Sequence, residues 1–394
     1  MIRKSIYLLI LVSVGWACRE KESPKDINSL KMENLKSFQI KIIDSIKVNF
    51  RGSYVVPVDI NSTNGNMLIV DKIKPQKVIQ TDRDGKIINE IFLQGEDGDK
   101  VGKIVSNIGY FDANTIVAAG MRGYYFYDFN GTLIRKVDAF NAEAGVFYYK
   151  IKRLNYKNDT ILVSTFRSVF SKQEIIDNSG RKVSDKIKFF TCHNLNTNQY
   201  HVLIGHEPSS IFLKTNFQYE VRPYFDLGEN NLIYTIFNPE NKVYVYSYAG
   251  NDVLLNKKIS IVSSYFQVPY MKEYGDKTFQ WEKSMFVNSQ ILGIYTGYQL
   301  GIISYKTGIP EHIYDEMQTK SQLSDLLLQY RKHFAVLLDV KEGKQISQDI
   351  ELPKNTVEVL GFRSSNELIL LPDLGIFEDP NQTTFYVGKL EEIK

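Results

Sequence analysis

Residues 67–91 read Met67-Leu-Ile-Val-Asp71, a short spacer, and then Val78-Ile-Gln-Thr-Asp82-Arg-Asp-Gly85-Lys-Ile-Ile-Asn-Glu-Ile91. Two runs of β-forming residues here flank a polar turn that ends in glycine. Aspartate and glycine both tolerate the positive φ angles that tight hairpin turns need. The stretch therefore predicts one strand followed by a β-hairpin.

The same pattern recurs along the chain, which indicates a repeat architecture. We count six copies and read each one as an inner strand followed by a hairpin. Later copies begin at Thr115, Thr160, Asn231, Gln290 and Glu367, and the fifth is irregular. Residues 18–394 shared among six copies give about 63 residues each, whereas a propeller blade usually takes roughly 40–50. Several connections must therefore be long, and the longest are expected at 168–187, 262–289 and 308–332.

Composition supports an all-β protein, because Tyr and Phe favour pleated surfaces and the chain has 25 Tyr and 23 Phe. One good helical stretch lies within 314–333, where Ser321 could cap a helix with Leu323, Leu326 and Leu327 on its apolar face. The chain is thus predicted to form a six-bladed β-propeller with four-stranded antiparallel blades. Residues 38–48 precede the first copy and could close the ring by joining the last blade.

The residues of the first copy also resemble a known family. Leu68-Ile-Val-Asp71 followed by Val78 to Ile87 resembles a blade of the six-bladed NHL/TolB-like propellers. Gln94-Gly-Glu-Asp-Gly98 resembles the Gly-rich loop that follows this hairpin in them. The resemblance covers about residues 37–394 and implies the six-bladed fold. It implies little about function, because one fold hosts many activities.

The N-terminus has the organisation of a secretory signal peptide. Arg3 and Lys4 precede an uncharged apolar run at 6–14, and small residues lead to Cys18. The run is too short for a membrane-spanning helix, which needs roughly 20 apolar residues. A cysteine directly after small residues resembles the lipobox of bacterial lipoproteins, which implies a lipidated Cys18. An ordinary signal peptide with an incidental cysteine remains the alternative.

These observations divide the chain into three segments. Residues 1–17 are predicted to be a lipoprotein signal peptide, 18–36 a flexible tether, and 37–394 the propeller. The expected location is the cell envelope, as an outer-membrane lipoprotein facing either the periplasm or the cell exterior, with the membrane as partner through the lipid anchor.

Several classes of function are disfavoured by composition and by missing motifs. Net charge is +3 with both signs interspersed, so no nucleic-acid partner is expected. Cys192 is the only cysteine besides Cys18, so no internal disulfide is expected. G-x-S-x-G, P-loop, H-E-x-x-H and C-x-x-C motifs are absent, which counts against common hydrolase, phosphoryl-transfer and zinc-protease mechanisms. No cofactor is expected.

His193 and His201 are weak candidates for a metal site. In a hairpin centred on Thr197 they would be equidistant from the turn and share one face of the sheet. Zinc needs four convergent ligands, or three and a water molecule, so two histidines alone predict no metal. A polar pair on an outer strand is the alternative.

Two groups of residues are candidates for ligand binding. Arg122, Arg167 and Arg222 come from three successive copies, and loops at such points converge on the mouth of a propeller's channel. There they could attract an anion such as a carboxylate sugar or a phosphate, although ordinary surface salt bridges are the alternative.

The second group is the aromatic insertion at 264–282. Its candidate residues are Tyr265, Tyr270, Tyr274 and Trp281. Aromatic faces between polar groups suit sugars or peptides. The alternative is that these aromatic rings cap the core of the fifth blade.

The resulting hypothesis is a membrane-anchored envelope lipoprotein whose propeller is a non-catalytic binding or scaffold domain for a glycan, a peptide or a protein partner. One alternative is an enzyme at the channel mouth, either a lyase or a glycan hydrolase. The other is a subunit of an envelope protein assembly.

Overall fold

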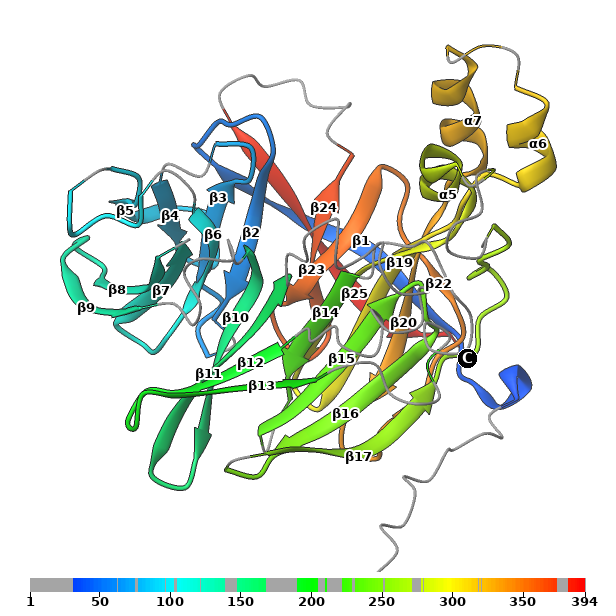
Figure 1. Ribbon diagram of the computed structural model, residues 1–394. Coiled ribbons are helices and arrows are strands. Elements are labelled where there is room, and N and C mark those ends of the chain that lie inside the picture. Colours follow the sequence, from blue (N-terminus) through cyan, green and yellow to red (C-terminus); the bar gives the residue numbers. More distant parts are fainter. Residues whose placement is uncertain are drawn as a thin grey trace, which may run out of the picture.

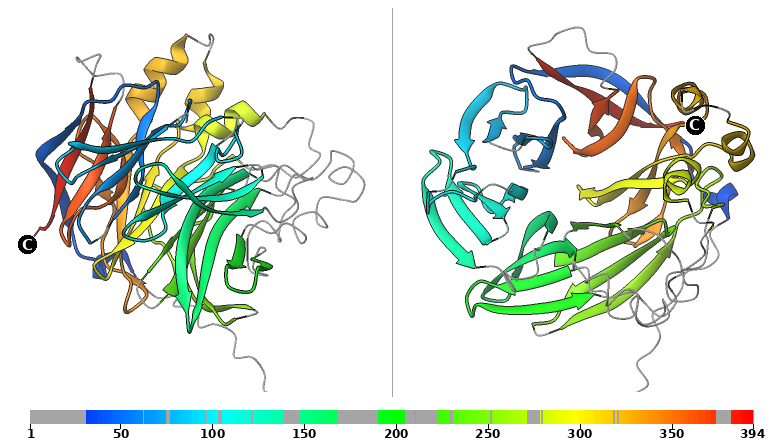
Figure 2. Two further views of the ribbon diagram at one scale, coloured as in Figure 1. Left: turned by 90° about the vertical axis from the view of Figure 1, so that its left-hand side faces the viewer. Right: turned by 45° about the horizontal axis from the view of Figure 1, so that its top comes forward.

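Six antiparallel sheets surround a central axis as the blades of a propeller in the computed structural model (Figures 1 and 2). The structure describes residues 31–393 except 62, 75–76, 96, 103–104, 121, 139–146, 168–189, 205–209, 211–221, 229–230, 251, 271–277, 279, 318, 320 and 374–381. The predicted all-β, six-bladed architecture is confirmed.

The first three blades each contain four strands in sequential order. Blade 1 consists of β2 (Val55–Ile60), β3 (Met67–Asp71), β4 (Lys77–Thr81) and β5 (Ile87–Phe92). Blade 2 consists of β6 (Val105–Tyr110), β7 (Thr115–Gly120), β8 (Gly123–Asp128) and β9 (Leu133–Asp138). Blade 3 consists of β10 (Phe147–Tyr156), β11 (Asp159–Arg167), β12 (Phe190–Asn194) and β13 (Gln199–Ile204).

The other three blades vary this pattern. Blade 4 consists of β14 (Arg222–Leu227), β15 (Leu232–Asn238), β16 (Lys242–Tyr248) and β17 (Val253–Ser260). Blade 5 consists of β18 (Gln290–Gly297), β19 (Leu300–Lys306) and β20 (His333–Asp339), with an outer strand in two short pieces, β21 (Lys344–Gln345) and β22 (Ile350–Glu351). Blade 6 consists of β23 (Thr356–Phe362), β24 (Glu367–Pro372), β25 (Thr383–Glu392) and β1 (Phe38–Val48).

The ring closes as the sequence predicts, with the first strand completing the last blade. Strand β1 pairs antiparallel with β25, from Phe38 opposite Glu392 to Val48 opposite Thr383. On the inner side, β23 of blade 6 contacts β2 of blade 1. Both ends of the propeller domain are therefore held in one sheet, which leaves no open edge between the first and last blades.

One expectation about the repeat is wrong. The first β-run of a copy is the innermost strand only in the fifth copy, at β18. In the other five it is the second strand, and a separate innermost strand precedes it: β2, β6, β10, β14 and β23. These preceding segments carry polar and charged residues among the apolar ones, so they do not resemble the regular β-runs.

Burial explains why the second and third strands carry the clearest signal. Residues Met67–Asp71 of β3 are all buried, because both faces of a middle strand pack against neighbouring blades. The outer strand β5 instead alternates and exposes Phe92. In the described part of the chain, a cluster of buried apolar side chains lies at each of the six blade interfaces. The core thus consists of separate apolar layers between neighbouring blades rather than one central cluster.

The predicted hairpin turn is also observed. The Asp82 carboxylate accepts hydrogen bonds from the backbone amides of Asp84 and Lys86, and Gly85 has φ +92°. Asp128 and Gly131 repeat the arrangement in blade 2, where Gly131 has φ +82°. Glycine is favoured at these turns because other residues rarely adopt this conformation.

The longest connections join strand ends that lie at one end of the propeller. We call the end at which the innermost strands begin the upper end. The second and the outer strand of each blade end there, and the third strand begins there, so the connections from the outer strand to the next blade and from the second to the third strand start and finish at the upper end. The three longest predicted connections are all of these two kinds. The upper end also carries the helices α5 (Trp281–Val287), α6 (Glu311–Asp315) and α7 (Gln322–Tyr330), seen at the top of Figure 1.

The predicted helix is present as α7, but its predicted cap is wrong. Ser321 precedes α7 without a capping side-chain hydrogen bond, and its hydroxyl instead lies 2.8 Å from that of Thr319. A short 3-10 helix, η1 (Met32–Asn34), precedes β1. Among the described residues, no helix has the length and apolar character to span a bilayer.

Candidate functional site

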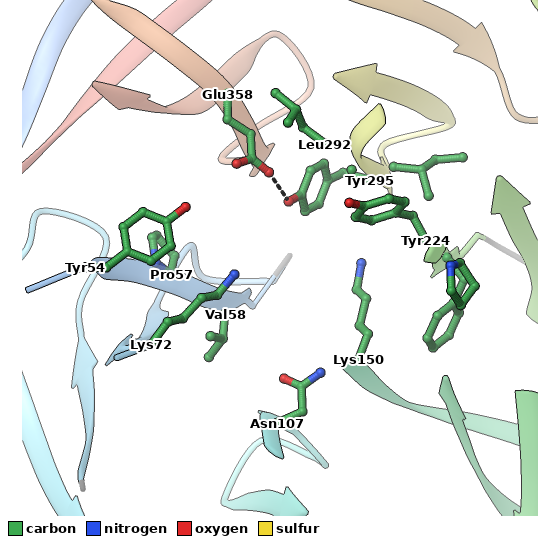
Figure 3. A pocket seen from close by; sticks show the side chains of 14 residues that line it. Tyr54, Pro57, Val58, Lys72, Asn107, Lys150, Tyr224, Leu292, Tyr295 and Glu358 are labelled. Carbon is green, nitrogen blue, oxygen red and sulfur yellow. Dashed lines mark hydrogen bonds between the residues drawn. The ribbon is translucent and has the colours of Figure 1, made fainter. Parts of the chain in front are cut away.

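An axial cavity of about 490 Å³ opens within the ring, and every blade contributes to it (Figure 3). It lies toward the upper end, where the innermost strands begin. Its lining consists of Tyr54, Pro57, Val58, Lys72, Asn107, Lys150, Pro223, Tyr224, Phe225, Leu292, Gly293, Ile294, Tyr295 and Glu358. A volume of this size is typical of sites for small molecules.

Two lysine ammonium groups point into the cavity from different blades (Figure 3). Lys72 follows β3 and is exposed, and its Nζ lies 5.9 Å from the centre of the Tyr54 ring. Lys150 lies on β10, and its Nζ lies 4.9 Å from the centre of the Tyr295 ring. Burial lowers the pKa of Lys150, although the nearby Asp226 carboxylate opposes this effect.

Glu358 on β23 is the carboxylate of the cavity wall. The Tyr295 hydroxyl donates a hydrogen bond of 3.4 Å to its Oε1. Burial raises the pKa of Glu358 to about 7, although Lys72, the Tyr295 hydroxyl and Lys306 each act to lower it. Near neutral pH, Glu358 can therefore hold or release a proton.

A network of four charged side chains fills the channel below the cavity. Lys152 Nζ lies 2.6 Å from Asp59 Oδ1 and 3.7 Å from Asp226 Oδ1, and Lys150 Nζ lies 3.2 Å from Asp226 Oδ1. Both aspartates are buried. All four residues line a smaller space of about 50 Å³ that also shares Tyr295 with the main cavity. The network therefore forms the floor of the cavity.

The floor also connects the blades. Asp59 of blade 1 accepts a hydrogen bond from the Tyr110 amide of blade 2, at 2.8 Å. Asp226 of blade 4 accepts one from the Thr296 amide of blade 5, at 2.9 Å. Since Lys152 of blade 3 bridges the two aspartates, the network fixes the relative positions of five innermost strands.

The backbones of the three predicted arginines lie at the upper end, where the cavity opens. Arg122 is in the turn between β7 and β8, Arg167 is the last residue of β11, and Arg222 is the first residue of β14. The Arg122 side chain is exposed and is not part of the cavity wall. Ligand binding by these arginines stays a prediction.

The predicted aromatic insertion lies at the same end, but two of its rings are used for packing. Tyr265 stacks on Phe334 of β20 with 4.5 Å between ring centres. Tyr270 is 5% exposed, and its backbone amide donates to the Asn288 side chain. Trp281 is the first residue of α5, and Tyr274 lies outside the described residues, as does Cys18. The described part of the insertion thus packs against blade 5 through Tyr265, and ligand contact by the insertion stays a prediction.

The expected pairing of His193 with His201 is wrong by one residue. In the β12–β13 ladder, His193 lies opposite Tyr200, and His201 lies opposite Cys192. The buried His193 ring stacks on Tyr200 with 3.6 Å between ring centres, and its Nε2 lies 3.0 Å from the Asn198 side-chain oxygen. Within the described ranges, no three His, Cys, Asp or Glu side chains gather as a metal site would require.

Sequence reasoning missed the residues of the cavity because most of them lie on the innermost strands, which it did not recognise. A signal was present: Asp59, Lys150, Lys152, Asp226 and Glu358 are charged residues inside short segments with β character. Charges are depleted from strands that face a core on both sides. Their presence in successive repeats therefore indicates a polar channel.

Comparison with known proteins supports the fold and does not assign a function. No protein-family model and no curated protein matches the chain. Among solved structures, a Bacteroides fragilis protein named as an exported protein is 11% identical, with 94% of this chain and 98% of that chain covered and a TM-score of 0.50. A gluconolactonase from Xanthomonas campestris is 9% identical, with 94% and 95% covered and a TM-score of 0.45. At 11% identity, the similarity to the Bacteroides fragilis protein shows the fold alone.

Proposed function

We propose that this protein is an envelope lipoprotein whose propeller binds a small polar ligand, of the saccharide class, in the axial cavity without converting it. The observation that carries the proposal is a cavity lined by all six blades, in which tyrosine rings alternate with lysine, amide and carboxylate groups. Aromatic faces and planar polar groups together suit sugar rings. The charged floor and the volume of about 490 Å³ favour a compact ligand over a long peptide or a folded partner.

The proposed anchor agrees with the direction of the chain. Strand β1 begins at Phe38 opposite Glu392, at the end of the propeller away from the cavity mouth. A lipid on Cys18 followed by the 18–36 tether would leave the mouth facing away from the membrane. We place the chain among relatives of the NHL/TolB-like propellers on the blade motif at 67–91.

A binding experiment tests the cavity. Purified full-length protein is applied to an array of neutral and acidic mono- and oligosaccharides, and hits are measured by calorimetry. Leu292→Trp introduces a bulky ring into the cavity wall, and Leu328→Trp, on an exposed position of α7, is the matched control. Binding should be lost in the first variant and retained in the second. Binding that survives Leu292→Trp in a folded protein, or an array without hits, refutes the proposal.

The lipid anchor is tested separately. Cells fed a radiolabelled fatty acid should label the wild-type chain and leave Cys18→Ser unlabelled. Labelling of both proteins or of neither would refute lipidation at Cys18, with no consequence for ligand binding in the cavity.

Catalysis is the second candidate, and Glu358 is the observation that favours it. A carboxyl group with a pKa of about 7 beside a tyrosine hydroxyl has the properties of a general acid or base. Product analysis of the bound saccharides after prolonged incubation separates the two functions. Turnover that disappears in Glu358→Gln identifies an enzyme, and unchanged saccharides identify a binding protein.

A further inference from the structure

The axial cavity contains mostly hydrogen-bond donors. The ammonium groups of Lys72 and Lys150 and the hydroxyls of Tyr54 and Tyr224 point toward its centre, whereas the Tyr295 hydroxyl points to Glu358 (Figure 3). Burial raises the pKa of Tyr54 and the pKa of Tyr295, so both hydroxyls stay protonated; Tyr54 can donate to a ligand, and Tyr295 donates to Glu358. Such a wall complements a ligand that is rich in acceptors.

Two donors of the wall have no acceptor to satisfy them in the described part of the chain. The side-chain nitrogen of Asn107 is buried and has no hydrogen-bond partner there. Lys72 has no ion-paired carboxylate among the described residues, and its only near contact with an aromatic ring is the 5.9 Å approach to Tyr54. The Asn107 nitrogen is costly because it is buried without an acceptor, whereas Lys72 is exposed and offers its charge to an acceptor of the ligand.

Counting charges indicates how much charge the ligand carries. The floor is neutral, because Lys150 and Lys152 balance Asp59 and Asp226. Above the floor the lining adds one cation, Lys72, and one carboxyl group, Glu358. The whole site is therefore neutral when Glu358 is ionised and carries one positive charge when Glu358 is protonated.

Glu358 is positioned to respond to a bound anion. The groups that face it are the Tyr295 hydroxyl of β18, Lys72 after β3, Tyr54 before β2, and Lys306 at the end of β19. An anion near Lys72 would compete with the Glu358 carboxylate for the same positive charge. Protonation of Glu358 removes this repulsion and leaves one net positive charge for the ligand.

We propose that the ligand of the axial cavity is a small organic acid with one carboxylate, which lies between Lys72 and Lys150 and binds together with a proton on Glu358. This inference rests on the proposed function, since it takes the axial cavity as the ligand site. One carboxylate matches the single positive charge of the protonated site. A dianion such as a phosphate monoester would leave one uncompensated negative charge in a partly buried space.

Matched pairs of sugars and sugar acids test the proposal. Calorimetry on the full-length protein compares glucuronate with glucose and galacturonate with galactose, at pH 6 and pH 8. The acids are ionised at both pH values, so a change in their affinity reports on the protein. With the pKa of Glu358 at about 7, the dissociation constant of an acid should be about tenfold higher at pH 8 than at pH 6. Neutral sugars should bind more weakly and without this change.

Two variants and one control assign the effect to the proposed groups. Glu358→Gln mimics the protonated carboxyl group, so at pH 8 it should bind an acid about as tightly as the wild type does at pH 6. Because this variant gains affinity, a folding defect cannot mimic it. Lys72→Met should weaken acid binding by about tenfold or more. Lys74→Met changes an exposed lysine on the same connection that is not in the cavity wall, and it should behave as wild type.

The outcomes separate this proposal from the proposed function. Neutral sugars that bind as tightly as their acids, an acid affinity that is equal at pH 6 and pH 8, or tighter binding of glucose 6-phosphate than of glucuronate would each overturn the monoacid proposal. Each of these results would leave the proposed function, saccharide binding in the axial cavity, intact. If no acid or neutral saccharide binds to the wild type, both proposals fail.

Discussion

Replacing Lys152 by methionine should cost about 3 kcal/mol of unfolding free energy. Lys152 Nζ lies 2.6 Å from Asp59 Oδ1, and the Asp59 side chain is only 5% exposed. Methionine keeps most of the volume and removes the charge, so Asp59 becomes a buried anion without its closest cation. Breaking a buried pair in this way typically costs 3–5 kcal/mol. Asp59 retains hydrogen bonds from the amides of Ile60 and Tyr110, which favours the lower end of this range.

Urea unfolding followed by circular dichroism measures the cost. The control is Lys41→Met, which removes a comparably short ion pair with Glu391, at 2.7 Å, on the exposed surface of β1 and β25. Surface pairs of this kind contribute about 0–1 kcal/mol, so this variant should unfold close to wild type. The double variant Asp59→Asn/Lys152→Met removes the unpaired charge and should recover part of the loss. A cost below about 1 kcal/mol for Lys152→Met would refute the role assigned to the channel floor.

Three further predictions concern stability. The pKa of Glu358 is about 7, above its ordinary 4.5. Its contribution to the free energy of unfolding is therefore full below pH 4.5 and is lost as pH rises through 7. In urea titrations at pH 8, Glu358→Gln should be about 2 kcal/mol more stable than wild type. Burial lowers the pKa of His193 from 6.5 to about 4, so the contribution of neutral His193 to the free energy of unfolding is lost as pH falls from 6.5 to 4. His193→Gln should reduce this acid-dependent loss of stability in thermal melts. A variant whose melting temperature depends on pH as the wild type's does would contradict this prediction. Gly85 has φ +92°, and an added Cβ would lie 2.6 Å from Ile46; Gly85→Ala should therefore cost about 1–3 kcal/mol, whereas Gly98→Ala, with no atom within 4 Å of the added Cβ, should cost far less.

Local sequence carried most of the information about the fold. The turn at Asp82–Gly85 is encoded by residues that lie beside one another in the chain, and the buried run at Met67–Asp71 needs only to be apolar on both faces. Repetition then strengthens the signal, since similar runs recur in each blade. The sequence also predicted that residues 38–48 close the ring by joining the last blade, because a β-run before the first repeat needs a partner strand.

The candidate site was harder to predict, because its residues are far apart in sequence. Tyr54, Asn107, Lys150, Tyr295 and Glu358 come from five different blades. The charges of Lys150 and Glu358 inside segments with β character point to a polar channel, but nothing local shows that these residues meet Tyr54, Asn107 and Tyr295 at one cavity. The pairing of His193 with Tyr200 similarly depends on hairpin register, which the composition of the turn did not determine.

The sequence by itself determined a six-bladed ring of antiparallel strands, because alternation, turn chemistry and repetition are properties of neighbouring residues. Only the tertiary structure decided what the ring encloses. Its closure brings Lys72, Lys150 and Glu358 to one cavity and Asp59, Asp226 and Lys152 to one floor. The physical reason is that charges and hydrogen-bond donors interact through space, over a few ångströms, between strands that the chain separates by tens to hundreds of residues.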